Sequence, residues 1–180
     1  KLTRSIKSNN HVRAQAGINF SGDSLLIQNC IIDRNTTTYG SSGENSGGVS
    51  ISSNGYVEII NSVISNNYPY GIRLNHNIDQ FPNVSYSNLY NNGVENYSKR
   101  SSIFADQTGV NGNISEYPLF IDSYSIDMTM GQVINNDPNF NYHLQEDSPC
   151  IDKGDPDKDG DGVIWAHDPD DQDSDGTRLD

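Results

Sequence analysis

Residues 57–67 read Val-Glu-Ile-Ile-Asn-Ser-Val-Ile-Ser-Asn-Asn, and a glycine-led stretch, Gly-Val-Ser-Ile, precedes them at 48–51. Similar units run through residues 17–35 and 71–92. Each unit contains a glycine, a short alternating strand, a polar turn, a second strand, an Asn, a third short apolar strand and a closing Asn. Because the strand content is constant while the spacing varies, the pattern predicts a regular stack of strands with loops of variable length.

A strand of four or five residues cannot bury its apolar face alone, but it can pair with the same strand of the next unit in a parallel ladder. The repeat therefore predicts an all-β, right-handed parallel β-helix (a solenoid). Asn29, Asn61 and Asn88 are the expected turn markers, because Asn tolerates left-handed backbone angles and its amide can bond to a stacked Asn. The corresponding glycines are expected at Gly17, Gly48 and Gly71.

An antiparallel sandwich of short strands remains open as an alternative. Asn-Gly pairs, which are typical of hairpin turns, occur at 54–55, 92–93 and 111–112. No window predicts a helix, because Gly, Asn, Ser and β-branched residues interrupt every candidate.

The chain is strongly acidic, with a formal net charge of −13 over 180 residues. A polyanion repels nucleic-acid phosphates and anionic lipids, so neither is an expected partner. The sequence has no run of 18 apolar residues, which excludes a hydrophobic transmembrane helix and membrane insertion of that kind. Cys30 and Cys150 both lie in apolar-flanked segments and are interpreted as buried thiols, with a disulfide as the alternative.

Two groups of residues resemble a known family. The segments 59–67 and 84–90 resemble the coils of pectate-lyase-like right-handed parallel β-helix proteins of the bacterial surface and secreted type. Residues 112–120, 148–156 and 175–180 resemble the closing segment of such proteins, which normally continues into one more short strand. The resemblance implies one domain, with coils over 1–150 and a truncated, irregular acidic closing segment over 151–180. It does not imply an activity, since this scaffold carries lyases, hydrolases, adhesins and structural modules.

The sharpest local chemistry lies in residues 157–168. Read as a 12-residue calcium loop, it places carboxylates at positions 1, 3, 5 and 12, a glycine at 6 and a backbone carbonyl at 7. Those ligands are Asp157, Asp159, Asp161, Asp168 and the carbonyl of Val163. Asp at position 12 departs from the EF-hand pattern and resembles dockerin-type loops, while flanking prolines discourage the two EF-hand helices.

A second acidic group begins shortly after the first loop. Asp171, Asp173 and Asp175 repeat the spacing of the first half of a calcium loop, followed by Gly176. These three residues are predicted as further calcium ligands. A solvated acidic tail is the alternative for both groups.

No catalytic constellation stands out in the sequence. Arg73 lies on an alternating strand in a row with Asn19 and Ser50, which carries no carboxylate. We therefore predict no catalytic residue and expect Arg73 to be an outward-facing surface residue. Tyr70 and Tyr86, with Arg73, are candidate binding residues because tyrosine rings stack on sugars, although packing against the core explains them equally well.

These observations predict a non-catalytic, secreted or cell-surface module stabilised by calcium, with a structural, adhesive or glycan-binding role. Polysaccharides or other surface proteins are the expected partners, and self-association through an uncovered end is also possible. The alternative is a carbohydrate-active enzyme, either a polysaccharide lyase or a glycoside hydrolase.

Overall fold

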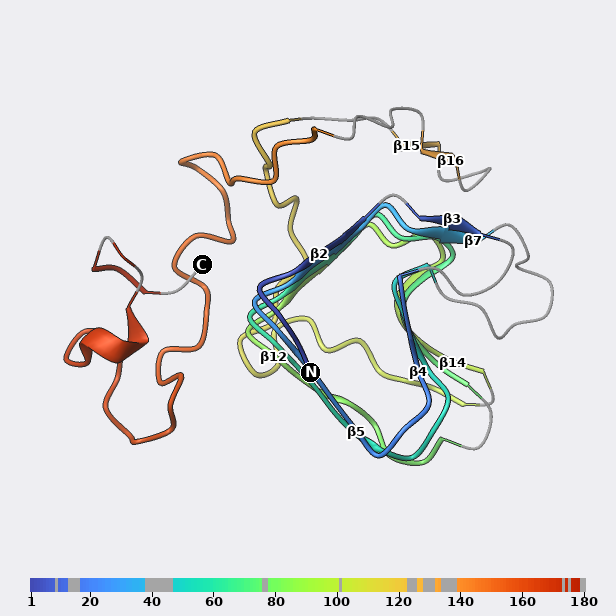
Figure 1. The fold of residues 1–180 in the computed structure, drawn as a ribbon, viewed down its shortest axis with the longest axis horizontal. Coiled ribbons are helices and arrows are strands. Elements are labelled where there is room, and N and C mark those ends of the chain that lie inside the picture. The colour runs from blue at the N-terminus through green and yellow to red at the C-terminus, as the bar shows by residue number, and fades with distance from the viewer. Residues whose placement is uncertain are drawn as a thin grey trace.

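The fold is taken from a computed structural model that describes residues 1–8, 10–12, 17–37, 47–75, 78–100, 102–122, 126–127, 132–133, 139–172, 174 and 176–178. The described residues are all-β, apart from a short 3₁₀ helix, η2 (Pro169–Asp171). Three four-stranded parallel sheets surround a common core, and their strands superpose when the molecule is viewed down the stack (Figure 1). The acidic C-terminal segment lies beside this body.

The first sheet is built from the longest runs of alternating apolar residues. Its strands, in spatial order, are β1 (Leu2–Thr3), β5 (Ser24–Gln28), β9 (Tyr56–Ile60) and β12 (Asn83–Ser85). Ile27 pairs with Ile59, and Ile59 with Val84, so one apolar column runs across the sheet. All three side chains are at most 3% exposed, which places this column in the core.

The second sheet carries a core column on one face and a mixed surface on the other. Its strands are β2 (Ile6–Ser8), β6 (Ile31–Asp33), β10 (Val63–Ser65) and β13 (Asn88–Tyr90). Ile32, Ile64 and Leu89 align across three strands and are fully buried. Residues of alternating sequence position, such as Ile31 and Val63, face the opposite side.

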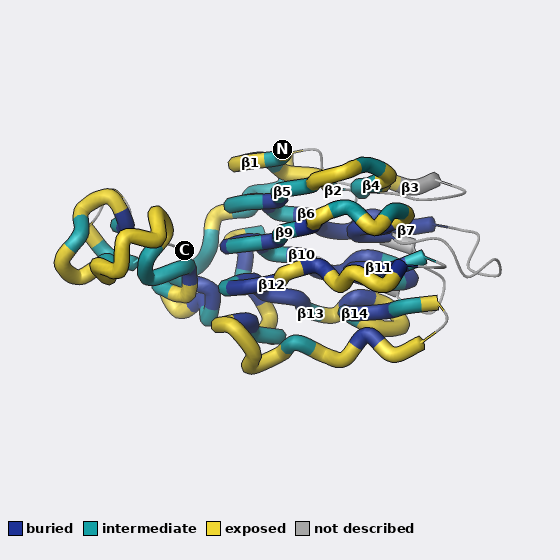
Figure 2. Tube along the Cα trace, turned by 90° about the horizontal axis from the view of Figure 1, so that it is seen from below, coloured by how far each residue is buried: buried dark blue, intermediate teal, exposed yellow. Residues whose placement is uncertain are grey.

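The third sheet completes the core. Its strands are β4 (Ile18–Phe20), β8 (Val49–Ile51), β11 (Tyr70–Leu74) and β14 (Glu95–Lys99). Its register pairs Asn19 with Ser50 and Ser50 with Arg73, which confirms the row predicted from the repeat. Figure 2 shows the strands of successive units lying one above another.

Two small sheets accompany the three larger ones. They are formed by the parallel pair β3 (His11–Val12) and β7 (Thr36–Thr37), and by the antiparallel pair β15 (Ile126–Asp127) and β16 (Gln132–Val133). Of the three larger sheets, the last strand in the sequence ends at Lys99.

The prediction of a single right-handed parallel β-helix over residues 1–150 is therefore wrong. The described strands are short and belong to separate sheets, and the strand set of the three large sheets ends well before residue 150. The physical reason lies after Lys99, where residues 102–122 form turns and isolated bridges, such as that of Asn88 with Ile114, instead of strands that would extend the three ladders. The antiparallel sandwich is also excluded for the three large sheets, because all of their pairings are parallel.

The predicted turn markers are only partly correct. Asn29 and Asn61 occupy equivalent bends between the first and second sheets, but the next residue in that column is Tyr86 (φ 46°). Asn88 instead pairs with Val63 inside the second sheet. The bend accepts Tyr86 because its backbone N–H still bonds to the carbonyl of Asn111 at 2.9 Å.

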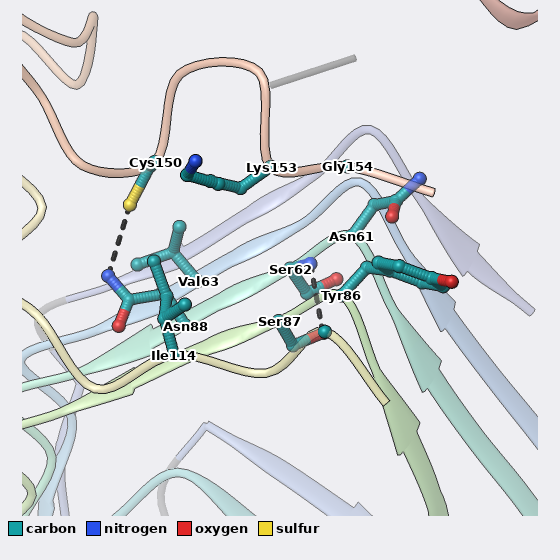
Figure 3. A pocket seen from close by; sticks show the side chains of 11 residues that line it. Asn61, Ser62, Val63, Tyr86, Ser87, Asn88, Ile114, Cys150, Lys153 and Gly154 are labelled. Atoms are coloured by element: carbon teal, nitrogen blue, oxygen red, sulfur yellow. Dashed lines mark hydrogen bonds between the residues drawn. The ribbon is translucent and has the colours of Figure 1, made fainter. Parts of the chain in front are cut away.

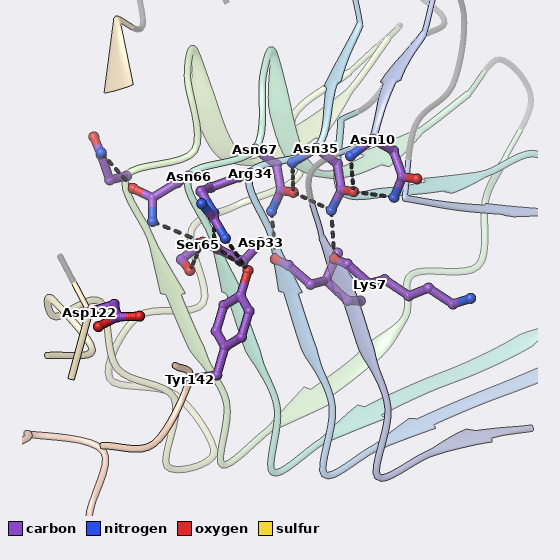
Figure 4. Close-up of polar contacts among 12 residues, drawn as sticks. Lys7, Asn10, Asp33, Arg34, Asn35, Ser65, Asn66, Asn67, Asp122 and Tyr142 are labelled. Atoms are coloured by element: carbon purple, nitrogen blue, oxygen red, sulfur yellow. Dashed lines mark hydrogen bonds and ion pairs between the residues drawn. The ribbon is translucent and has the colours of Figure 1, made fainter. Parts of the chain in front are cut away.

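The asparagine ladder forms at the closing residues of the units (Figure 4). The side chain of Asn35 donates to Asn67 Oδ1 at 3.0 Å, and that of Asn67 donates to Asn92 Oδ1 at 2.9 Å. Asn10 and Asn96 extend the ladder at its two ends. Each internal amide also bonds to a backbone carbonyl, so the column satisfies buried polar groups at the bend after the second sheet.

The glycine positions follow from close approach of the backbones. A Cβ at Gly48 would lie 2.1 Å from the carbonyl oxygen of Gly71, and one at Gly17 would lie 2.3 Å from that of Gly48. No side chain fits at such distances, which explains why a glycine opens these units.

Candidate metal centre

The acidic segment after Gly154 folds back on itself and brings carboxylates together. Asp157, Asp159 and Asp171 each offer an oxygen, and these oxygens lie within 4.8 Å of one another. Two ligands that hold one calcium ion at about 2.3–2.6 Å cannot be more than about 5 Å apart, so this spacing suits a single cation. A second group, Asp159, Asp161 and Asp168, meets the same distance. These acidic clusters could hold a metal ion.

Local turns aim the first carboxylates inward. Asp157 accepts hydrogen bonds from the backbone N–H groups of Gly160 at 2.9 Å and Gly162 at 3.0 Å. Both glycines have positive φ, 77° and 88°, and a Cβ at either position would meet open space. Here glycine is required by backbone conformation, because other residues rarely adopt such φ values.

Asp171 reaches the first loop from the far side. It ends the η2 turn, which Asp168 caps by accepting a hydrogen bond from the Asp170 N–H at 2.9 Å. Asp171 Oδ1 accepts from the Lys158 N–H at 2.8 Å, and the residue is fully buried. Asp171 Oδ2 is buried with no hydrogen-bond partner among the described residues. An unpartnered buried carboxylate oxygen is costly, and a cation would compensate it.

The predicted calcium ligands are therefore rearranged. The structure places Asp157, Asp159, Asp161 and Asp168 in the two clusters, and it adds Asp171, which the sequence predicts as a ligand of the second acidic group. Val163 is 40% exposed, and its N–H donates to Asp161 Oδ1 at 2.7 Å. The remaining predicted ligands, Asp173 and Asp175, lie outside the described residues.

Electrostatics in this region reflect the crowding of negative charge. Burial is the main cause that raises the pKa of the Asp155 carboxyl, and the nearby carboxylates of Asp157 and Asp171 raise it further. A hydrogen bond from the Asp157 backbone N–H acts in the opposite direction and lowers this pKa. Lys158 Nζ donates to the backbone carbonyl of Asp170. The ammonium group thus lies at the edge of the cluster without an ion pair to a carboxylate among the described residues.

Contacts among the described residues join the acidic segment to the strand-rich body. The Asp155 N–H donates to Asn61 Oδ1 at 2.8 Å. Arg178 Nε donates to the Gly154 carbonyl at 2.5 Å, and its guanidinium lies 5.7 Å from the centre of the Tyr86 ring. The segment is therefore attached at the bend between the first and second sheets, near Tyr86.

The three candidate binding residues do not form one site. The Arg73 guanidinium lies 4.5 Å from the centre of the Tyr70 ring and also donates to Ser98 Oγ. Arg73 lies between the core residues Ile72 and Leu74 and so points away from the core, as expected. It is only 6% exposed, however, so the expectation of a solvated surface residue is wrong, and this burial lowers its pKa. Tyr86 belongs to a different bend, under Arg178. Arg73 is shielded from solvent together with its neighbours across the sheet, Ser50 and Ser98, which are also buried.

A buried ion pair on the second sheet was missed by sequence reasoning. Arg34 Nε donates to Asp33 Oδ2 at 2.9 Å, and both side chains are at most 1% exposed. Asp33 also accepts from Ser65, Asn66 and Tyr142 (Figure 4). Tyr142 comes from the segment that covers this sheet, so only tertiary packing reveals the partner set.

No protein family, curated protein or solved structure matches the chain in comparisons with known proteins. The resemblance to pectate-lyase-like proteins and to dockerin-type loops therefore stays a prediction. None of the described helical residues forms a segment long and apolar enough to cross a membrane. Cys30 and Cys150 are both buried and are not joined in a disulfide.

Proposed function

We propose that this chain is a non-catalytic module of a secreted or cell-surface protein, and that its acidic C-terminal segment binds calcium. The observation that carries the proposal is the buried Asp171 Oδ2, which has no partner among the described residues and lies in one oxygen cluster with Asp157 and Asp159. The ion would supply the missing partner and hold the two ends of the segment together.

The chemistry of the ligand set favours calcium. All candidate ligands are hard oxygen donors, which select calcium, magnesium or manganese rather than softer metals. The aspartates alternate along a loop with glycine turns, and calcium tolerates irregular coordination better than magnesium does. Extracellular calcium modules work at dissociation constants of about 10⁻⁴–10⁻³ M, so the proposed location predicts a calcium affinity in that range.

The ion's role is structural. It would fix the acidic segment as one unit, and that unit is attached to the strand-rich body through the Asp155–Asn61 hydrogen bond and the contact of the Arg178 guanidinium with the Tyr86 ring. Polysaccharides or other surface proteins are the proposed partners of the module.

A calcium titration monitored by Trp165 fluorescence tests the proposal. Trp165 lies inside the segment: its N–H donates to the Pro156 carbonyl at 2.7 Å, and its own carbonyl accepts from Gln172. We expect a saturable calcium response and a weaker one with magnesium. Asp171→Asn should weaken calcium binding about tenfold or more, since even the loss of an outer-shell group costs 10–100-fold.

Asp170→Asn is the matched control. It removes the same charge from the same short helix, but Asp170 is exposed and belongs to neither cluster. Its calcium affinity should stay within about twofold of the parent, as expected for an exposed charge. An absent response, or equal loss in both variants, would exclude the proposed site.

A further inference from the structure

The three Asn-Gly pairs of the chain share a reactivity that the acidic segment does not use. They lie at 54–55, 92–93 and 111–112. In such a pair the glycine nitrogen can attack the side-chain carbonyl carbon of the asparagine, because no Cβ on the glycine shields that nitrogen. The new C–N bond closes a succinimide ring, and the side-chain nitrogen leaves as ammonia with the proton of the glycine N–H. Water then opens the ring to aspartate or isoaspartate.

The fold protects the pair Asn92 and Gly93. Asn92 is 4% exposed, and its Oδ1 accepts from the side chain of Asn67 in the asparagine ladder. Its Nδ2 donates to the Ile64 carbonyl at 2.9 Å and to Asn96 Oδ1 at 2.8 Å. The attacking group is occupied as well, because the Gly93 N–H donates to the Asn67 carbonyl at 2.9 Å. Ring closure would have to break these hydrogen bonds inside the stack, which raises its barrier.

The pair Asn54 and Gly55 is exposed at its side chain but is also held. Asn54 Oδ1 accepts from the backbone N–H groups of Asp79 at 2.8 Å and Gln80 at 3.4 Å. A Cβ at Gly55 would lie 2.2 Å from the carbonyl oxygen of Gly22, so this backbone packs closely against the neighbouring unit. The side chain that must turn toward the glycine nitrogen is therefore fixed, and so is the backbone that must rotate.

The pair Asn111 and Gly112 is held least. Both residues are exposed, and neither the Asn111 side chain nor the Gly112 N–H forms a hydrogen bond with the described residues. The Asn111 carbonyl accepts from the Tyr86 N–H at 2.9 Å, and rotation toward the ring has to break this bond. The fold also requires the glycine: Gly112 has φ +74°, and a Cβ there would lie 2.4 Å from Cδ1 of the Tyr86 ring.

We propose that Asn111 is a modification site, at which the folded chain deamidates to aspartate and isoaspartate. The reaction consumes water and releases ammonia, so it needs no other reactant. It uses none of the proposed calcium ligands, so this proposal and the proposed function stand or fall separately.

Isoaspartate at this position loosens the cover on the last unit of the stack. The Ile114 N–H donates to the Ser87 carbonyl at 3.0 Å, and the Leu89 N–H donates to the Ile114 carbonyl at 3.1 Å. Figure 3 shows Ile114 beside Asn88, its bridge partner on β13. In isoaspartate the chain continues through the side-chain carbon, which lengthens the backbone just before this bridge. The bridge has to shift or open, because its hydrogen bonds depend on distance and angle.

Peptide mapping by mass spectrometry tests the proposal on the whole chain, incubated in mildly alkaline buffer. We expect deamidation at Asn111 to be at least about tenfold faster than at Asn54 or Asn92. In concentrated urea the three rates should become similar, because the reacting groups are the same and only the fold separates them. Equal rates in the folded chain overturn the proposal, and so does an Asn111 that stays intact while the unfolded chain reacts.

Two variants separate the reaction from its consequence. Asn111→Gln keeps an amide but requires a larger ring, so ammonia release should fall at least about tenfold, and parental release overturns the assignment. Asn111→Asp carries the added charge without the longer backbone. The aged chain, separated from its parent by that charge, should contain a population whose Leu89 and Ile114 amides exchange hydrogen at least about tenfold faster than in Asn111→Asp. Exchange equal to that of Asn111→Asp overturns the proposed loosening.

Discussion

Asn67 Nδ2 donates a hydrogen bond to Asn92 Oδ1 at 2.9 Å, across two neighbouring units of the fold. On its other side, Asn67 Oδ1 accepts from both the backbone and the side chain of Asn35 at 3.0 Å. The residue is fully buried, so its amide replaces water for groups on three units. The closing asparagines thus connect the stack along its length.

Replacing the central asparagine should be costly. Asn67→Ala leaves the Asn35 donors and the Ile32 carbonyl buried without this partner. At about 1–3 kcal/mol for each unsatisfied group, we expect the free energy of unfolding to fall by about 3 kcal/mol or more. Urea denaturation measures it. Asn10→Ala, at the exposed end of the same ladder, should cost about 1 kcal/mol. Equal losses would contradict the idea that burial of the unsatisfied partners sets the cost.

The buried Asp33–Arg34 pair predicts a different pattern. Arg34→Met leaves the Asp33 carboxylate buried without its cation, and it should lower the free energy of unfolding by about 3–5 kcal/mol. Hydrogen exchange of residues 139–144 should rise, because Arg34 lies 4.1 Å from the centre of the Phe140 ring and bonds to Tyr142. Adding Asp33→Asn should recover part of the loss, since the uncompensated charge is then removed.

A pair with one exposed partner provides the control for that experiment. Lys99 and Asp79 lie 3.9 Å apart, with the Lys99 side chain 8% exposed and the Asp79 side chain 95% exposed. Asp79→Asn removes the exposed partner and should change the free energy of unfolding by less than about 1 kcal/mol. A comparable loss in Asp79→Asn would mean that burial of the Asp33–Arg34 pair is not what makes it costly to break.

Asp171→Asn should stabilise the acidic segment without calcium and destabilise it, relative to the parent, with calcium. Without the ion, the substitution removes a buried charge with an unpartnered oxygen, and its own carbonyl can still accept from Lys158. We therefore expect unfolding of the segment, followed by Trp165 fluorescence in EDTA, to require about 1 kcal/mol more than in the parent. In saturating calcium the parent gains the binding free energy and becomes the more stable of the two. A variant that is less stable in both conditions would contradict this account.

Tyr97 carries a hydroxyl that the core does not satisfy. The residue is 5% exposed, and its oxygen has no hydrogen-bond partner among the described residues. Tyr97→Phe should therefore raise the free energy of unfolding by up to about 1 kcal/mol at neutral pH, measured by urea denaturation. Tyr56→Phe, at a 51% exposed position, should have no effect.

The same hydroxyl predicts an alkaline dependence of stability. Burial, with a smaller contribution from the Asp106 carboxylate, raises the pKa of Tyr97 above its ordinary value. Above about pH 10 the unfolded chain loses the proton and the folded chain keeps it, so the free energy of unfolding falls as pH rises. Below about pH 10 the hydroxyl keeps its proton in both the folded and the unfolded chain, so it gives the free energy of unfolding no pH dependence there. Tyr97→Phe should flatten part of the decline between pH 10 and 12, and an unchanged slope would contradict the assignment.

Several features of the fold follow from local sequence. The row of Asn19, Ser50 and Arg73 and the closing asparagines were predictable, because identical strand patterns place equivalent residues at equivalent positions. The turn marker predicted at Asn88 was wrong because the third unit bends at Tyr86. Tyr86 has a left-handed backbone conformation, which a tyrosine in the sequence does not indicate. The acidic spacing predicted the loop from Asp157, but not that Asp171 would complete its first cluster.

The sequence by itself determined the all-β character, the repeated strands, the glycines and the acidic loop, because these depend on alternation and on backbone conformations that few residues adopt. Only the tertiary structure decided that the strands form separate sheets, that Asp33 and Arg34 are buried together, and that Asp171 joins the first loop. Those outcomes depend on which distant segments meet and exclude water. The free-energy cost of burying a carboxylate, and its ability to bind a cation, are set by those neighbours and not by its position in the sequence.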